Sequence, residues 1–338
     1  MHVTLLVPDL FWPHDDGGGA YRELELPALA RFLARARQRS LPPQSLEAWL
    51  CQAFGVERQR DWPVAPFTLN FDGGDAGDDY WLRADPVHLT PRRNQMTLVD
   101  PEALEPGAED AAELIAALNR HFAGDGLVFQ APHPLRWYLR VPGSPRLMTR
   151  EISEAAGRDI GGALPCGENG PRWRHALNEI QMLLHEHPVN QRRESCGKLP
   201  INSVWLWGGG RRRAVPGQRF SHVGGTNALA LALALAASSG AKTTVPEGVP
   251  DRAAHKLIVA DASAARYGDD EAWRQALAEI ERAWFAPLLS ALTRRNLDGL
   301  AVVALHPRAC EHFEATPMDL LKFWRPVRPL SAHAPGAR

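Results

Sequence analysis

Three polar side chains at the ends of apolar runs are the first candidates for chemistry. Asp9, Asp261 and His306 come where the predicted strands at about residues 2–7, 255–260 and 299–305 end. Ligands of open α/β proteins bind outside the carboxyl ends of the strands, so these side chains could converge there. Carboxylate and imidazole together suit Mn²⁺ or Zn²⁺. The alternative is that all three are ordinary turn residues, because Asp is common after a strand.

The richest polar stretch lies between residues 185 and 202, around two prolines. Its candidate ligand-binding residues are His187, Asn190, Arg193, Lys198 and Asn202. Basic side chains beside amides are what phosphate or carboxylate binding requires. His185 and His187 are two residues apart and do not share a helix face, so a joint metal site is not expected. The alternative is helix capping combined with surface charge.

Two shorter stretches carry weaker signals. Arg83 and His88 could face a cleft, but Arg83 could equally form a structural pair with Asp85. The glycines at 208–210 follow a predicted strand and precede three arginines. Neither GxxxxGK[ST] nor GxGxxG is present, so a tight turn is the plain alternative to a phosphate loop.

A protein nucleophile is harder to find. No GxSxG motif occurs, and no serine or threonine lies in a glycine-rich turn between a strand and a helix. Ser40, Ser45 and Thr68 are the N-terminal hydroxyls that could serve, and none has a supporting context. The catalytic residues therefore stay unassigned at this stage.

Composition narrows the classes of function. The 338 residues hold 38 Lys and Arg against 39 Asp and Glu, which gives a net charge of −1. Non-specific nucleic-acid binding needs a basic field, so no nucleic-acid partner is expected. The four cysteines have neither disulfide nor zinc spacing, and the longest apolar run, at 228–237, is about half a membrane span. The first residues look like a strand rather than a signal peptide, and we expect a cytoplasmic protein without membrane association.

The elements that must position these residues alternate between strands and helices. Helices are predicted near 25–37, 108–122, 228–237 and 270–293, the last kinked at Pro287. In the last 140 residues this alternation favours a doubly wound, mostly parallel sheet, to which a strand at 202–207 should belong. We expect an α/β core from residues 1–75 and 186–325, an inserted α+β domain at 76–170, and a disordered tail at 326–338.

One long segment carries a family resemblance. HPVNQRRESCGKLPINSVWLWGGG, at 187–210, resembles the HPxNxxR…GKxPAN…LWGxG block of archaeal-type cofactor-independent phosphoglycerate mutases, which belong to the alkaline phosphatase superfamily. EDAAELIAALN at 109–119 and FQAPHPLRWYL at 129–139 look like parts of the domain inserted in that family. NEIQMLLHEHPVN and WLRADPVHL look closer still to the bacterial regulatory protein RpfE group. The resemblance implies an alkaline-phosphatase-like core.

The departures from that family bear on activity. The stretch corresponding to the family's nucleophilic serine, DWPVAPFTL at 61–69, has no serine. The family's EAPDEAGH corresponds to ADASAARY at 260–267, which keeps only Asp261. A two-metal centre needs a cluster of carboxylates and histidines, so Asp9, Asp261 and His306 would hold one divalent ion weakly at best.

The first hypothesis is therefore a degenerate phosphoglycerate-mutase-like protein with a regulatory or phosphorylated-ligand-binding role. Its partners would be a phosphorylated small molecule or another protein. The second is an active metal-dependent phosphomutase or phosphatase with a rearranged site, in which Thr68 or a metal-bound water attacks phosphorus and His312 joins the metal ligands. A protein-interaction surface built on exposed tryptophans is the remaining alternative.

Overall fold

The computed structural model describes residues 1–14, 19–92, 95–216, 219–237, 240–241, 254–262, 265 and 267–336. The chain divides into two compact units. Unit 1 contains residues 1–54 and 216–338, and unit 2 contains residues 55–215. The inserted unit is thus longer at both ends than the segment 76–170 expected from the sequence.

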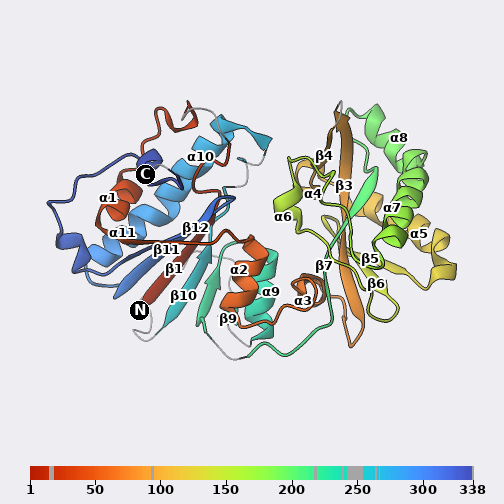
Figure 1. Cartoon of the computed structure of the whole chain (residues 1–338), viewed down its shortest axis with the longest axis horizontal. Helices are drawn as coiled ribbons and strands as arrows, with labels where there is room; N and C mark the ends of the chain where they lie inside the picture. The colour runs from red at the N-terminus through yellow and green to blue at the C-terminus, as the bar shows by residue number, and fades with distance from the viewer. Residues whose placement is uncertain are drawn as a thin grey trace. The chain divides into compact units, whose positions relative to one another are not determined.

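Unit 1 is built on a seven-stranded sheet in the order β2-β12-β11-β1-β10-β8-β9. From β11 to β9 every neighbouring pair is parallel, whereas β12 and β2 are antiparallel at one edge. The strands are β1 (His2–Pro8), β2 (Arg37–Leu41), β8 (His222–Gly224), β9 (Gly240–Ala241), β10 (His255–Val259), β11 (Gly299–His306) and β12 (Ala309–Ala315). Figure 1 shows β1, in red, lying between the late strands of the chain.

Helices pack on both faces of this sheet, as expected for a doubly wound core (Figure 1). One face packs against α1 (Pro27–Arg35), α10 (Asp270–Ile280) and α11 (Ala286–Thr293), and the other against α2 (Leu46–Ala53) and α9 (Ala228–Ala236). A π-helical turn, η4 (Glu281–Phe285), joins α10 to α11, and Pro287 lies in the first turn of α11. The α-helix predicted over 270–293 is thus interrupted just before Pro287, whose nitrogen cannot donate a helical hydrogen bond. Short 3-10 turns are η1 (Gly19–Tyr21), η5 (Asp319–Leu321) and η6 (Leu330–His333).

Unit 2 contains a second sheet, in the order β4-β3-β6-β5, with β7 also paired to β3. The strands are β3 (Tyr80–Arg92), β4 (Gln95–Val99), β5 (Val128–His133), β6 (Arg136–Val141) and β7 (Ser203–Gly210). The helices are α3 (Val64–Phe71), α4 (Pro101–Leu104), α5 (Ala108–His121), α6 (Ile152–Ala155), α7 (Gly170–His185) and α8 (Pro188–Ser195), with a 3-10 turn η2 (Ala123–Asp125). The amphipathic helices α5 and α7 bury their apolar stripes in one core with the sheet.

Two expectations about the ends of the core are corrected. The strand at 202–207 is β7, and it pairs antiparallel with β3 in unit 2 instead of joining the parallel sheet. Its run of fully buried residues looks like that of a parallel core strand. An apolar run shows that a strand is buried, but it does not indicate which strand it pairs with. The tail is not disordered over residues 326–336: η6 forms there, and Leu330 packs into the core of unit 1.

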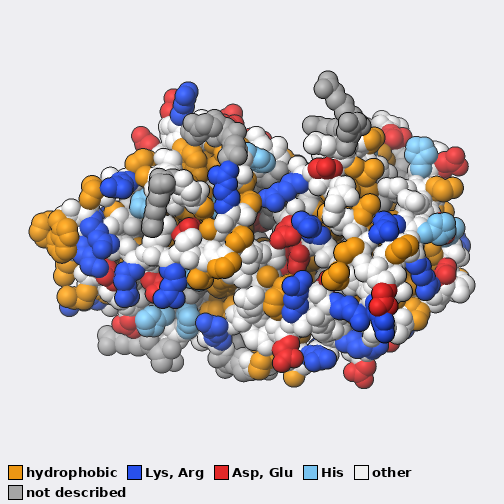
Figure 2. Space-filling view, in the orientation of Figure 1, with side chains coloured by type: hydrophobic (Ala, Val, Ile, Leu, Met, Phe, Trp, Pro, Cys, Tyr) orange, Lys and Arg blue, Asp and Glu red, His pale blue; other side chains and the backbone are white. Residues whose placement is uncertain are grey.

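Three smaller observations concern the thiols, the surface charges and the helices. All four cysteines are free. On the face seen in Figure 2, basic and acidic side chains are interspersed. Within the described residues, none of the helices combines the length and the apolar character needed to cross a membrane.

Candidate functional site

The strand-end residues Asp9, Asp261 and His306 come to one edge of the parallel sheet. β1 lies between β11 and β10, with Pro8 opposite Leu305 and Leu6 opposite Val259. The next residues along these three strands therefore leave the sheet at the same carboxyl edge. The sheet topology thus places the three strand ends at one edge, and the convergence of the side chains themselves stays a prediction.

The local geometry shows what each of these residues does. Asp9 has a φ of +56°, its backbone N–H donates to the Leu305 carbonyl, and its carbonyl accepts from Trp273 Nε1 at 2.8 Å. His306 is buried, and its Nδ1 accepts the backbone N–H of Arg308 at 3.1 Å. Asp261 is exposed. The turn role weighed for these residues is thus present at Asp9 and His306.

The donor set does not fit a metal centre. Across the part of the chain that the structure describes, no group of three or more His, Cys, Asp or Glu side chains could hold a metal ion. Asp9, Asp261 and His306 all belong to that part, so they do not form such a group. His312 lies on β12 opposite Val303, three residues before His306 along β11, and does not complete one. Ser263, Ala264 and Arg266 of the resembling stretch lie outside the described residues.

The hydroxyl considered as a nucleophile is used within its own helix. Thr68 lies on α3 in unit 2 and is 1 % exposed. Its Oγ1 donates to the carbonyl of Val64 at 3.1 Å, one turn earlier. A buried hydroxyl with this partner cannot attack a phosphate from solvent without leaving its place in the fold.

Asn190, in the polar block at 185–202, is a structural clamp in unit 2. The Asn190 amide donates to the carbonyls of Leu184 and Ile201 at 2.7 and 2.8 Å, and its oxygen accepts the N–H of Ile201 at 2.7 Å. The side chain is 1 % exposed, so it joins the end of α7 to the segment before β7.

Three neighbours of Asn190 also have partners within the chain. Arg193 donates to the carbonyls of Leu199 and Leu104 and pairs with Asp110 at 3.1 Å. Asn202 exchanges two hydrogen bonds with the backbone of Leu89 on β3. His187 is the N-cap of α8 and accepts from Val189, while Lys198 is exposed. Helix capping, the alternative weighed for this stretch, is therefore present in the structure.

Arg83 lies in a buried ionic cluster on β3. Its Nε and Nη2 contact the Asp85 carboxylate at 2.9 and 2.6 Å, and its guanidinium lies over the rings of Tyr138 and Trp207. Trp207 Nε1 also donates to Asp85 at 2.7 Å. Burial raises the pKa of Asp85, and the charge of Arg83 opposes that rise. The structural pair considered for Arg83 is observed, and His88 bonds the Pro200 carbonyl at 2.8 Å.

A second buried carboxylate next to this cluster was missed in the sequence. Asp72 accepts two hydrogen bonds from Arg136, at 2.8 and 2.5 Å, and one from the Tyr138 hydroxyl. Burial acts to raise the pKa of Asp72, but these hydrogen bonds outweigh it and hold the pKa below its usual range. Asp72 follows α3 in a glycine-rich break, where the pattern suggested only a turn.

Known proteins resemble this chain in sequence and in fold. No protein-family model matches the chain. It is 30 % identical over 204 residues to the probable 2,3-bisphosphoglycerate-independent phosphoglycerate mutase of Geobacter sulfurreducens, covering 57 % of this chain and 50 % of that protein. It is 27 % identical over 152 residues to the 2,3-bisphosphoglycerate-independent phosphoglycerate mutase 2 of Methanothermobacter thermautotrophicus, covering 44 % and 36 %. The chain thus spans half or less of the length of these relatives.

A solved structure, that of the PH0037 protein from Pyrococcus horikoshii, matches over 93 % of this chain and 87 % of its own, with a TM-score of 0.53 and 15 % identity. At that identity the likeness concerns the fold alone. The predicted α/β fold class, with a doubly wound and mostly parallel sheet, is confirmed. The sequence matches support a phosphoglycerate-mutase-like family.

Proposed function

We propose that this phosphoglycerate-mutase-like chain lacks mutase turnover and has a regulatory or phosphorylated-ligand-binding role. The proposal places it with regulatory proteins of the RpfE type rather than with active mutases. A phosphorylated small molecule and a protein are the partners it implies, in the cytoplasm, with neither nucleic acid nor membrane involved.

The state of Thr68 is the observation that carries this proposal. In the stretch that corresponds to the family's nucleophilic serine, Thr68 is the only hydroxyl, and it is buried and bonded to Val64. A mutase that shuttles phosphate through the protein needs an accessible nucleophile for the covalent step. Asn190, Arg193 and Asn202 also favour a lack of turnover, because their side chains hydrogen-bond backbone carbonyls of the chain itself.

An exposed apolar surface in unit 1 supports the proposal that the partner is a protein. Between residues 318 and 327, five large apolar side chains are more than half exposed, among them Phe323 at 82 % and Trp324 at 68 %. Clustered exposed apolar side chains mark interaction sites more often than isolated ones do. This surface fits a regulatory role in which another protein is bound.

An active metal-dependent phosphomutase or phosphatase is the second candidate. The common edge reached by Asp9, Asp261 and His306 favours it, because hydrolysis by water needs no protein nucleophile. The donor groups of the described residues do not fit a two-ion centre, and this misfit ranks the candidate below the first.

The deciding experiment is a mutase assay with 3-phosphoglycerate and Mn²⁺, beside an active phosphoglycerate mutase. We expect no 2-phosphoglycerate above the enzyme-free control. Calorimetric titration of chelator-treated protein with Mn²⁺ and then Zn²⁺ should show at most one weak site. A clear mutase or phosphatase rate that disappears in the double variant Asp9→Ala, Asp261→Ala would establish the second candidate instead.

A further inference from the structure

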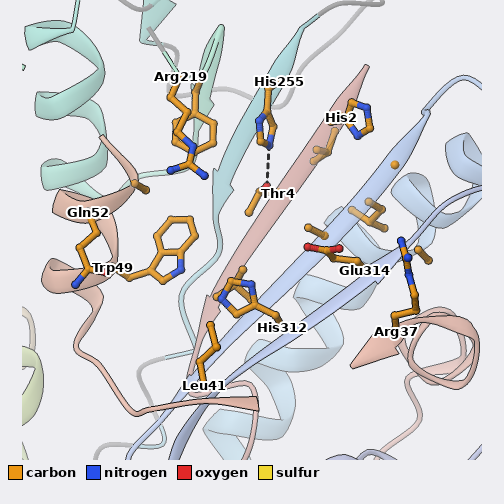
Figure 3. Close-up of a pocket in the computed structure, with 18 of the residues that line it drawn as sticks. His2, Thr4, Arg37, Leu41, Trp49, Gln52, Arg219, His255, His312 and Glu314 are labelled. Carbon is orange, nitrogen blue, oxygen red and sulfur yellow. Dashed lines mark hydrogen bonds between the residues drawn. The ribbon is translucent and has the colours of Figure 1, made fainter. Parts of the chain in front are cut away.

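A cavity of about 490 Å³ opens on the sheet of unit 1, away from the carboxyl edge. It is lined by the first residues of β1, β10 and β11 and by the last residues of β12 (Figure 3). The cavity therefore lies on the amino-terminal half of the parallel strands. Asp9, Asp261 and His306 lie beyond the opposite ends of these strands, so the two places are distinct.

The pairing of the strands explains why polar side chains gather on this face. Residues opposite one another in neighbouring strands point to the same side of a sheet. Thr4 is opposite Ala301, Ala301 is opposite Glu314, and Glu314 is opposite Arg37. His312, two residues before Glu314 on β12, shares that side.

The other side of the same strands is apolar. Val3, Leu5, Leu300, Val302 and Phe313 are at most 2 % exposed and form the core beneath α1, α10 and α11. The sheet already has its packed face, so the imidazoles, hydroxyl and charges of the cavity face are not needed to build the core. Gly299 lets the His2 ring lie close against β11 on this face, because a Cβ at that position would come within 2.6 Å of His2 Nδ1.

Two histidines provide ring nitrogens on the cavity side of the sheet. His255 Nε2 lies 2.9 Å from Thr4 Oγ1, whereas His312 Nε2 is buried and has no hydrogen-bond partner among the described residues. Burial lowers the pKa of both rings. An unmade hydrogen bond at a buried polar atom is unfavourable, and a ligand group that bonds there removes that cost.

The walls of the cavity contribute an arginine and two aromatic rings. Arg219 reaches into the cavity from the segment before β8, and the indole of Trp49 on α2 lies beside it (Figure 3). Phe220 packs against the His255 ring with centroids 5.0 Å apart. Arg37 and Glu314 are opposite charges on paired strands, which leaves Arg219 as the cation nearest the aromatic wall in Figure 3.

We propose that this cavity binds a small phosphorylated compound with a flat ring, of the class of a nucleoside monophosphate. The phosphate pairs with Arg219, the ring packs on Trp49, and a polar group of the ligand bonds His312 Nε2. A volume of about 490 Å³ is within the ~300–1,000 Å³ typical of small-molecule sites. The site is separate from the edge discussed under the proposed function and does not depend on it.

Calorimetric titration of the full chain tests the proposal, with AMP, adenosine and inorganic phosphate as separate probes. We expect AMP to bind more tightly than either part alone. Arg219→Gln should weaken AMP binding by about tenfold, because it removes a charge-assisted hydrogen bond. His312→Gln should weaken it by about fivefold, the effect of one ordinary hydrogen bond.

Arg282→Gln is the matched control, because Arg282 is an exposed arginine of unit 1 outside the cavity lining and pairs with Glu279. It should bind AMP like the unaltered chain. Three outcomes would each overturn the proposal: no heat at millimolar AMP, unchanged affinity in Arg219→Gln, or inorganic phosphate binding as tightly as AMP. The 3-phosphoglycerate assay is read independently, so failure here leaves the proposed lack of mutase turnover untouched.

Discussion

At the residue scale, unit 2 contains charged side chains in its interior. Asp72, Arg136 and Tyr138 are joined by short hydrogen bonds, next to the fully buried pair Arg83–Asp85. Removing one partner of a buried ion pair costs more than the pair contributes, because the remaining charge is left without compensation. Sequence proximity does not reveal this cluster, since Asp72 and Arg136 are separated by 64 residues.

Asp72→Asn tests the energetic role of the cluster. We expect it to lower the free energy of unfolding by about 2–3 kcal/mol at pH 7, less than for a fully buried pair because Arg136 is partly exposed. Asp79→Asn breaks an exposed pair with Arg140 and should cost under about 0.5 kcal/mol. Urea unfolding of both variants gives the comparison, and equal effects would contradict this account.

The same pair predicts a pH dependence. The pKa of Asp72 is lower in the folded state than its usual value, so its stabilisation is complete above about pH 4. It is lost as the pH falls through the lowered pKa. The stability difference between the unaltered chain and Asp72→Asn should therefore shrink in acid, and a constant difference down to pH 2 would argue against an ionised Asp72.

At the element scale, α1 depends on a distant residue for its first turn. Glu281, in the π-helical turn η4, accepts the backbone N–H groups of Ala28 and Leu29 at 2.5 and 3.1 Å. α1 begins at Pro27 without a capping side chain of its own. The carboxylate thus satisfies two N–H groups that a helix start leaves open.

Glu281→Ala should destabilise unit 1 by about 2 kcal/mol through loss of this cap. Glu279→Ala, two residues earlier and exposed, is the control and should change stability little. Thermal unfolding measured by circular dichroism compares them. Equal melting temperatures for the two variants would show that the cap contributes nothing.

The segment from α7 to β7 behaves as a scaffold rather than as a ligand site. Asn190→Ala leaves two carbonyls and one N–H without their partner, so we expect a loss of about 2–3 kcal/mol in unfolding free energy. Gln191→Ala, at the exposed neighbour, should be nearly neutral. If Asn190→Ala instead kept full stability and abolished binding of 3-phosphoglycerate, the scaffold role would be refuted.

At the scale of the whole molecule, the chain has two units with separate apolar cores. We expect differential scanning calorimetry to resolve two transitions. Asp72→Asn should shift the transition of unit 2, and Glu281→Ala that of unit 1, because each substitution acts within one core. A single transition moved by both variants would show that the units unfold together.

Local patterns in the sequence were enough to predict much of the fold. The apolar runs at β1, β10 and β11 and the stripes of α5, α7 and α10 follow from the periods of strand and helix, which neighbouring residues determine. Because parallel strands share one carboxyl edge, the common location of Asp9, Asp261 and His306 followed as well. The polar strand β2, RQRSL, carries no such pattern and was missed.

What the tertiary structure alone decided are the pairings between distant residues. The partner of β7, the burial of Thr68, the Asp72–Arg136 pair and the shared side of Thr4 and His312 depend on which strands and helices come together. A local period sets which residues face inward, but strand register and burial are set by non-local packing. For that reason the sequence predicted the apolar core and the carboxyl edge of the sheet. Only the fold showed which polar side chains are already hydrogen-bonded within the chain.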